Sequence, residues 1–246
     1  MRVIVVGAGL AGLSATESLA AAGVDVILLE AGHRFGGRTR TVSDGYINGQ
    51  YAESGAEWLD SIHWRMRDLM QRFGIKPLGQ PMPWTTIRRW LYWDQAFYTA
   101  ENIAALSPGV FRAIEKYEAL ADSPASGVQD PSRPDLHPEA AYLDSISVAD
   151  LITQSGLDPV GQLFARRDSQ GEFASDPENV SSLFVAQQRA FENSEVVKQG
   201  IELLSQRVAG GTGQIAISLG KQLQDSPRIT INFGTRLVAV EQDDSG

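Results

Sequence analysis

A glycine-rich turn between an apolar run and a helical run is the feature that most constrains the fold of this 246-residue chain. Residues 2–6, RVIVV, form a short β-branched run, which predicts a strand buried on both faces. Residues 7–12 hold three glycines, and the stretch LSATESLAAAG at 13–23 is typical of a helix that stops at its last glycine. A second strand is predicted at 24–29. The pattern therefore predicts a βαβ unit of a parallel sheet.

The spacing of the three glycines indicates a site for a dinucleotide. Gly7 permits the tight turn, Gly9 lets the backbone approach a pyrophosphate, and Gly12 allows close packing of the helix on the strand. Leu10 and Ala11 complete the turn, and the N-terminus of the helix that follows offers free N–H groups and a positive partial charge to the phosphates.

An acid ends the second strand, where a dinucleotide site needs an acceptor for the ribose. Glu30, followed by Ala31, is placed to accept hydrogen bonds from the 2′- and 3′-hydroxyl groups. A carboxylate there would repel a 2′-phosphate, which argues against NADP. These residues alone leave FAD and NAD both open, and a glycine turn without a nucleotide is the plain alternative.

A second glycine-rich element follows the acid and carries a resemblance to a known family. Gly36-Gly37-Arg38 resembles the GGR element of the FAD-dependent amine oxidase superfamily, which includes monoamine, polyamine and L-amino acid oxidases. The resemblance implies FAD as the cofactor. It also implies that the Arg38 guanidinium engages the pyrophosphate or holds the loop around it, whereas a solvated loop arginine is the alternative.

The segment YAESGAEW at 51–58 resembles the part of the same family that passes close to the isoalloxazine ring. Gly55 and Ala56 fit that position because small residues leave room for a flat ring. The resemblance places Glu57 and Trp58 at the same site.

Two further stretches match the family in the right order. VAGGTGQIAISL at 208–219 resembles the glycine-rich re-entry into the FAD domain and predicts a helix from its last glycine. RITINFGTRLVAVEQ at 228–242 resembles the strand pair that follows, with a turn at Gly234 and a backbone contact to adenine at Leu237.

The resemblance implies an α/β fold, namely a Rossmann-type FAD-binding domain with a parallel sheet and an inserted, mainly helical substrate domain. We expect residues 1–80 to form the first part of the FAD domain, 81–205 the insert and 206–246 the return. The family's fold continues beyond the matching stretches. We therefore expect a fold that is incomplete at the C-terminus, a second polypeptide or longer precursor that completes it, and a homo- or hetero-oligomer.

The middle of the chain resembles the family only weakly. Six aromatic residues crowd between 84 and 98, where a hairpin core is favoured over a substrate cavity. The proline-rich stretch 123–138 predicts a surface loop. Helices are predicted at 64–73, from 147, at 159–167, at 180–191 and at 194–206.

Charge and composition exclude several classes of protein. The net charge is −9 and no run of Lys or Arg stands out, so nucleic acid is not an expected partner. The apolar stretches are far too short for a membrane span. The chain has no cysteine, and its three histidines lack the spacing of a zinc motif. A strand that begins at Arg2 leaves no room for a signal peptide, so the cytoplasm is the expected compartment.

The resemblance implies oxidative deamination of a small amine or amino acid. The substrate's α-carbon loses its hydrogen to flavin N5, water hydrolyses the resulting imine, and oxygen reoxidises the flavin to give hydrogen peroxide. No catalytic residue is assigned, because none of the lysines matches the family's catalytic lysine. Another FAD oxidoreductase with a GGR element, such as a desaturase or a porphyrinogen oxidase, is one alternative, and a non-catalytic flavin-binding subunit is the other.

Overall fold

The computed structural model describes residues 1–82, 91–199 and 204–242. The chain forms two compact units. Unit 1 consists of Met1–Met82 and Glu202–Gly246, and unit 2 of Pro83–Ile201. Unit 1 is therefore built from two stretches of chain that are far apart in sequence.

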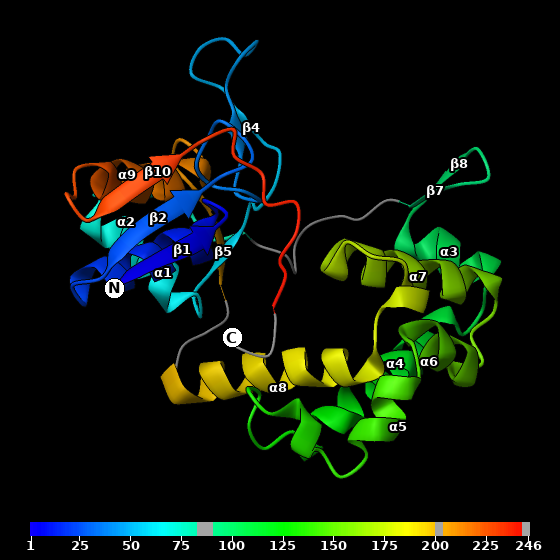
Figure 1. The fold of residues 1–246 in the computed structure, drawn as a ribbon. Coiled ribbons are helices and arrows are strands. Elements are labelled where there is room, and N and C mark those ends of the chain that lie inside the picture. The colour runs from blue at the N-terminus through cyan, green and yellow to red at the C-terminus, as the bar shows by residue number, and fades with distance from the viewer. Residues whose placement is uncertain (83–90, 200–203, 243–246) are drawn as a thin grey trace. The chain divides into compact units, whose positions relative to one another are not determined.

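The predicted βαβ unit opens unit 1. Strand β1 (Arg2–Val6), helix α1 (Leu10–Ala21) and strand β2 (Asp25–Leu29) follow one another, and β1 pairs with β2 in parallel. Strand β10 (Ile229–Asn232) pairs in parallel with the other side of β2, which gives the order β1-β2-β10. Helix α9 (Gly213–Gln224) packs with α1 on one face of this sheet (Figure 1). The prediction of a parallel α/β sheet is confirmed.

The core of unit 1 lies between that sheet face and the two helices. Leu28 of β2 and Leu13 of α1 are fully buried, as is Leu219 of α9, and Val5 of β1 packs against them. Apolar side chains that alternate along the strands meet the apolar stripe of each helix, so the sheet and both helices share one core.

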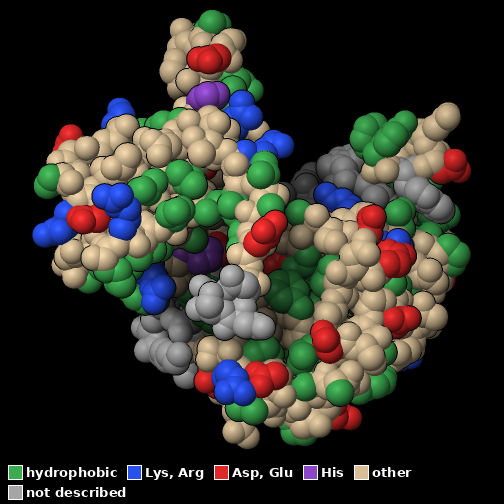
Figure 2. Space-filling view, in the orientation of Figure 1, with side chains coloured by type: hydrophobic (Ala, Val, Ile, Leu, Met, Phe, Trp, Pro, Cys, Tyr) green, Lys and Arg blue, Asp and Glu red, His purple; other side chains and the backbone are tan. Residues whose placement is uncertain are grey.

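The opposite face of the sheet is open, which contradicts the expectation that β1 is buried on both faces. Ile4 is 60% exposed and Val6 52% exposed, on the same face as Ile27 and Leu29 of β2. Figure 2 shows hydrophobic side chains on this side of unit 1. The sequence pattern of β1 is that of a strand covered on both sides, but no described residue covers the second side.

Short strands complete unit 1. Strand β3 (Thr41–Val42) pairs with β4 (Ala52–Glu53), while β5 (Leu59–Asp60) and β6 (Pro77–Leu78) flank the returning strand β9 (Ser205–Val208). Helix α2 (Trp64–Arg72) agrees with the helix predicted at 64–73. The helix predicted at 194–206 is wrong at its end, because Ser205 and Gln206 pair as a strand with β5.

The strand predicted at 236–242 is absent. Residues 235–242 have no regular secondary structure, and the side chains of Val238 and Val240 are largely exposed. A strand exists through its pairing with a neighbour, and no described segment pairs with this one.

Unit 2 is mainly helical, and its described residues also form a hairpin and short 3₁₀ turns. Helices α4, α6, α7 and α8 share a core that contains Val148, Leu151 and Ile152. The elements are β7 (Leu91–Trp93), β8 (Ala96–Tyr98), α3 (Ala100–Leu106), α4 (Val110–Asp122), η2 (Ser123–Gly127), η3 (Pro134–Leu136), α5 (Ala140–Ser145), α6 (Val148–Ser155), α7 (Pro159–Phe173), η4 (Pro177–Asn179) and α8 (Ser182–Gln199).

Three details of unit 2 differ from expectation. The helices predicted at 180–191 and 194–206 are one helix, α8, through Gln199, because no Gly or Pro interrupts it. The stretch 123–138 is not a plain surface loop, since Val128 and His137 are buried in it. In the hairpin, Tyr92 and Phe97 pack on each other yet remain largely exposed, so they are not core residues. Trp84 and Trp90 lie outside the described residues.

Among the residues that the structure describes, no helix combines the length and the apolar character that crossing a bilayer requires.

Candidate functional site

The glycine turn gives each of its three glycines a different physical role. Gly7 has a φ of +96°, a conformation that L side chains rarely adopt. A Cβ on Gly12 would overlap the carbonyl oxygen of Gly7, so helix α1 lies too close to the turn for any larger residue. A Cβ on Gly9 would find no protein atom nearer than 4.0 Å. Gly9 therefore leaves space open without a left-handed backbone, and this fits the approach of a pyrophosphate.

The N-terminus of α1 is not capped by the protein. Its N-cap residue is Gly9, no side chain hydrogen-bonds to the first turn, and no acid lies in that turn. The Leu13 N–H donates to the Gly9 carbonyl at 2.9 Å, which leaves the N–H groups of Leu10, Ala11 and Gly12 without an intrahelical acceptor. These three groups and the helix dipole fit the binding of an anion.

Glu30 ties the glycine turn to the loop that follows β2. Its two carboxylate oxygens accept the N–H groups of Ala8 and Gly32, each at 2.7 Å. A carboxylate has about four lone-pair positions, so two remain for ribose hydroxyls. Ala31 lies exposed beside it.

The GGR loop packs directly on the glycine turn. The Gly36 N–H donates to the Ala8 carbonyl at 2.9 Å, and a Cβ on Gly37 would lie 3.3 Å from the Cα of Gly9. Gly36 and Gly37 both have positive φ, at +112° and +56°. The two glycine elements of the sequence therefore form one surface around Gly9.

An arginine that sequence reasoning missed holds this loop in shape. The guanidinium of Arg34 donates to the carbonyl oxygens of Gly37 at 2.7 Å, Phe35 at 3.2 Å and Thr39 at 3.4 Å. No sequence signal pointed to Arg34, because a clamp of this kind depends on the path of the loop backbone.

Arg38 is exposed, and its backbone connects the GGR loop to the segment 51–58. Its carbonyl accepts the Ala56 N–H at 3.0 Å, and a Cβ on Gly55 would overlap that same carbonyl. Gly55 is thus required by chain packing, a reason that differs from the expected space for a ring. No hydrogen bond or ion pair engages the Arg38 guanidinium among the described residues, which leaves it available to a phosphate.

The returning segment 205–213 is bonded to the segment 51–58 at several points. The Tyr51 hydroxyl donates to the Val208 carbonyl at 2.8 Å, and the Thr212 N–H donates to Glu53 Oε1 at 2.7 Å. Arg207 pairs with Glu57 at 3.0 Å and lies 5.9 Å from the ring centroid of Trp58. These contacts hold the segments 51–58 and 205–213 together at one side of the candidate site.

The segment after β10 begins beside Glu30. The Thr235 N–H donates to the Glu30 carbonyl, and the Gly234 N–H to the Gly32 carbonyl, both at 2.9 Å. Leu237 follows two residues later with a 47% exposed side chain. The structure therefore gathers the glycine turn, Glu30, the GGR loop and 55–58, while Leu237 lies at the margin.

Comparison with known protein families shows to which family the chain belongs. A family described as flavin containing amine oxidoreductase matches residues 10–246. The chain is a member of that family. FAD is the cofactor that this membership supports, and the open glycine turn, the uncapped helix and Glu30 fit its adenosine diphosphate half.

The chain spans about half the length of the relatives that it matches. A probable flavin-containing monoamine oxidase A from Dictyostelium discoideum is 24% identical over 243 residues, which are 96% of this chain and 51% of that protein. Cyclohexylamine oxidase from Brevibacterium oxydans superimposes with a TM-score of 0.69 at 23% identity, over 94% of this chain and 50% of that one. A CLA-producing fatty acid isomerase from P. acnes superimposes with a TM-score of 0.60 at 21% identity, over 94% and 51%.

Replacement of Glu30 tests its assignment to the ribose. The Glu30→Ala variant is expected to bind FAD about 1.5–3 kcal/mol more weakly, the usual scale for a hydrogen bond to a charged group. Its free energy of unfolding should fall as well, because the Ala8 and Gly32 N–H groups lose their acceptor. Flavin titration and urea unfolding measure the two effects. Asp44→Ala, an exposed acid of the same unit, is the control, and an unchanged flavin affinity of Glu30→Ala would show that another group holds the ribose.

Proposed function

We propose that unit 1 is the FAD-binding domain, that unit 2 is the first part of a substrate domain, and that the protein oxidises an amine or amino acid to the imine. The observation that carries this proposal is the contact between the glycine turn and the GGR loop. The two elements meet at Gly9, which bridges to Gly36 and whose Cβ position has no protein atom nearer than 4.0 Å.

Each part of the site has a role in the proposal. Glu30 and Ala31 hold the ribose, and the N–H groups at the start of α1 hold the pyrophosphate together with Arg38. Gly55, Ala56, Glu57 and Trp58 lie along the ring, while the backbone at Leu237 meets the adenine. When bound, FAD supplies an acceptor for the hydride of the carbon that carries the nitrogen. The protein residues position the cofactor and keep water away from its ring.

The proposal extends to the partners of the protein. Oxygen is the final electron acceptor and hydrogen peroxide the product. Further polypeptide of the same fold covers the open face of the sheet at Ile4 and Val6, since parallel sheets are normally covered on both faces. The cytoplasmic location expected from the sequence stays a prediction.

One observation favours a second candidate function. The fold is shared with a fatty acid isomerase as well as with amine oxidases, and a fold does not by itself fix the substrate. A flavin enzyme that acts on carbon–carbon bonds is therefore the alternative.

Release of the cofactor and anaerobic reduction test the proposal. The purified protein is expected to be yellow and to release FAD on heating or in acid. In the presence of the completing polypeptide and without oxygen, a substrate amine should bleach the flavin and yield ammonia after hydrolysis. Release of FMN or NAD would overturn the cofactor assignment, and bleaching by an unsaturated lipid with no response to amines would favour the alternative.

A further inference from the structure

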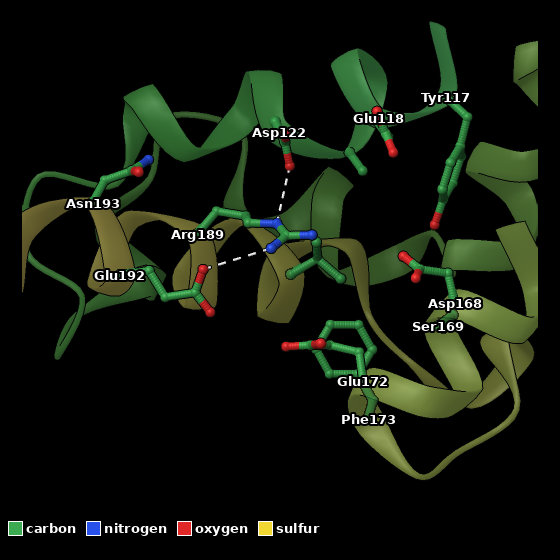
Figure 3. Close-up of a pocket in the computed structure, with 12 residues that line it drawn as sticks. Tyr117, Glu118, Asp122, Asp168, Ser169, Glu172, Phe173, Arg189, Glu192 and Asn193 are labelled. Atoms are coloured by element: carbon green, nitrogen blue, oxygen red, sulfur yellow. Dashed lines mark hydrogen bonds and ion pairs between the residues drawn. The ribbon is translucent and has the colours of Figure 1, made fainter. Parts of the chain in front are cut away.

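Unit 2 contains a cavity that the flavin site does not use. Its volume is about 380 Å³, and it lies among helices α4, α7 and α8 (Figure 3). Five of its lining residues are acidic and one is basic. These are Glu118 and Asp122 of α4, Asp168 and Glu172 of α7, and Arg189 and Glu192 of α8.

The single arginine of the cavity is already paired. Its Nε lies 3.0 Å from Asp122, and one terminal nitrogen lies 3.5 Å from Glu192. Glu118, Asp168 and Glu172 have no Lys or Arg within ion-pair distance among the described residues. The cavity therefore carries an excess of negative charge, which favours a cation.

A buried phenol faces the same space. Tyr117 is only 8% exposed, and in Figure 3 its hydroxyl group points toward Asp168. No hydrogen bond joins that hydroxyl to any residue that the structure describes. Burial and the charge of Asp168 raise the pKa of Tyr117 to about 12, so the phenol stays neutral at physiological pH. The hydroxyl lines the cavity, where it can accept a hydrogen bond from a ligand with N–H donors. The Oγ of Ser169, another lining residue, is also buried without a hydrogen-bond partner.

The walls favour an organic cation over a metal ion. Phe173, Val185 and Ala121 line the cavity beside the acids and provide apolar surface. In the described part of the chain, no group of three or more acidic or histidine side chains converges closely enough to hold a metal. Spread carboxylates, an aromatic hydroxyl and apolar walls suit ammonium groups joined by a short carbon chain.

We propose that this cavity binds an aliphatic di- or polyamine, with its ammonium groups on Glu118, Asp168 and Glu172 and its carbon chain against Phe173 and Val185. The site lies wholly within unit 2 and does not depend on the flavin. It is a binding site and is assigned no chemical step.

Calorimetry with 1,4-diaminobutane and the whole 246-residue chain tests the proposal. Glu118→Gln and Asp168→Asn are each expected to weaken binding about tenfold, the scale of a charge-assisted hydrogen bond. Tyr117→Phe should weaken binding about threefold, because one neutral hydrogen bond is lost. The matched control is Glu115→Gln, an exposed acid on the same helix outside the cavity, for which we expect less than about a twofold change.

Three further measurements make the outcome decisive. Circular dichroism must show that each variant keeps the helical content of the wild type. The Gly9→Val variant should bind the diamine unchanged, and a loss there would place the amine at the flavin site instead. No diamine binding by the wild-type chain, an equal effect of Glu115→Gln and Glu118→Gln, or full displacement of the diamine by an equal concentration of Mg²⁺ would each overturn the proposal.

Discussion

Replacement of Gly12 by Ala is expected to destabilise unit 1 by about 3 kcal/mol or more, since overpacking at a backbone contact costs this much. The added methyl group would overlap the Gly7 carbonyl, and neither the helix nor the turn can move without breaking β1–β2 pairing. Gly9→Val should lower the free energy of unfolding much less than Gly12→Ala, because a Cβ at Gly9 has no protein atom nearer than 4.0 Å. Its FAD affinity should fall below detection, since the side chain would occupy the place of the pyrophosphate.

Urea unfolding and flavin titration of both variants separate the two effects. Gly171→Ala, at an open position on helix α7 of unit 2, controls for the general effect of the substitution. A Gly9→Val protein that folds and keeps its FAD affinity would disprove the placement of the cofactor. A Gly12→Ala protein as stable as the wild type would disprove the packing argument.

The second large effect concerns turnover. The 246-residue chain alone is expected to show no amine-dependent formation of hydrogen peroxide, and the activity should appear when the completing polypeptide is supplied. Hydride transfer requires the substrate to be held about 3–3.5 Å from the acceptor atom in a closed site. Unit 1 presents an open sheet face with Ile4 and Val6, and in the function proposed above further polypeptide supplies the enclosing layer.

The same open face predicts self-association of the chain when it is expressed alone. Light scattering should show a mass that rises with concentration, because association of two molecules would bury the apolar side chains exposed on this face. Ile4→Thr with Val6→Thr should reduce that association and keep the fold, whereas Ile27→Thr alters a less exposed position and serves for comparison. A stable monomer that oxidises an amine would refute both expectations.

The βαβ unit could be predicted from the sequence because every signal in it is local. The glycines, the apolar run of β1 and the acid after β2 fall within one continuous stretch, so periodicity and turn chemistry were enough. The residues expected beside the flavin ring and the adenine rest instead on the family resemblance, and they stay a prediction. The carbonyl clamp by Arg34 was missed, since it follows from loop geometry that composition does not encode.

Errors arose where distant contacts decide the conformation. Ser205 and Gln206 were predicted to be helical but form a strand, because β5, far earlier in the chain, pairs with them. Residues 236–242 were predicted to form a strand, but no described segment pairs with them. A helix was predicted to start at Ser194, yet α8 continues through this residue. A strand forms only where a partner strand lies beside it, and the local sequence pattern of one segment does not identify that partner.

The bonds between 51–58 and 205–213 also fix the order of events during folding. The Tyr51–Val208 hydrogen bond joins residues 157 positions apart, and the Thr212–Glu53 bond joins residues 159 apart. High contact order slows folding, since a long loop must close before these contacts form. Unit 2 is synthesised entirely within that interval. On the ribosome, the helical unit should therefore fold first, and the two halves of the sheet unit should join only after residue 213 has emerged.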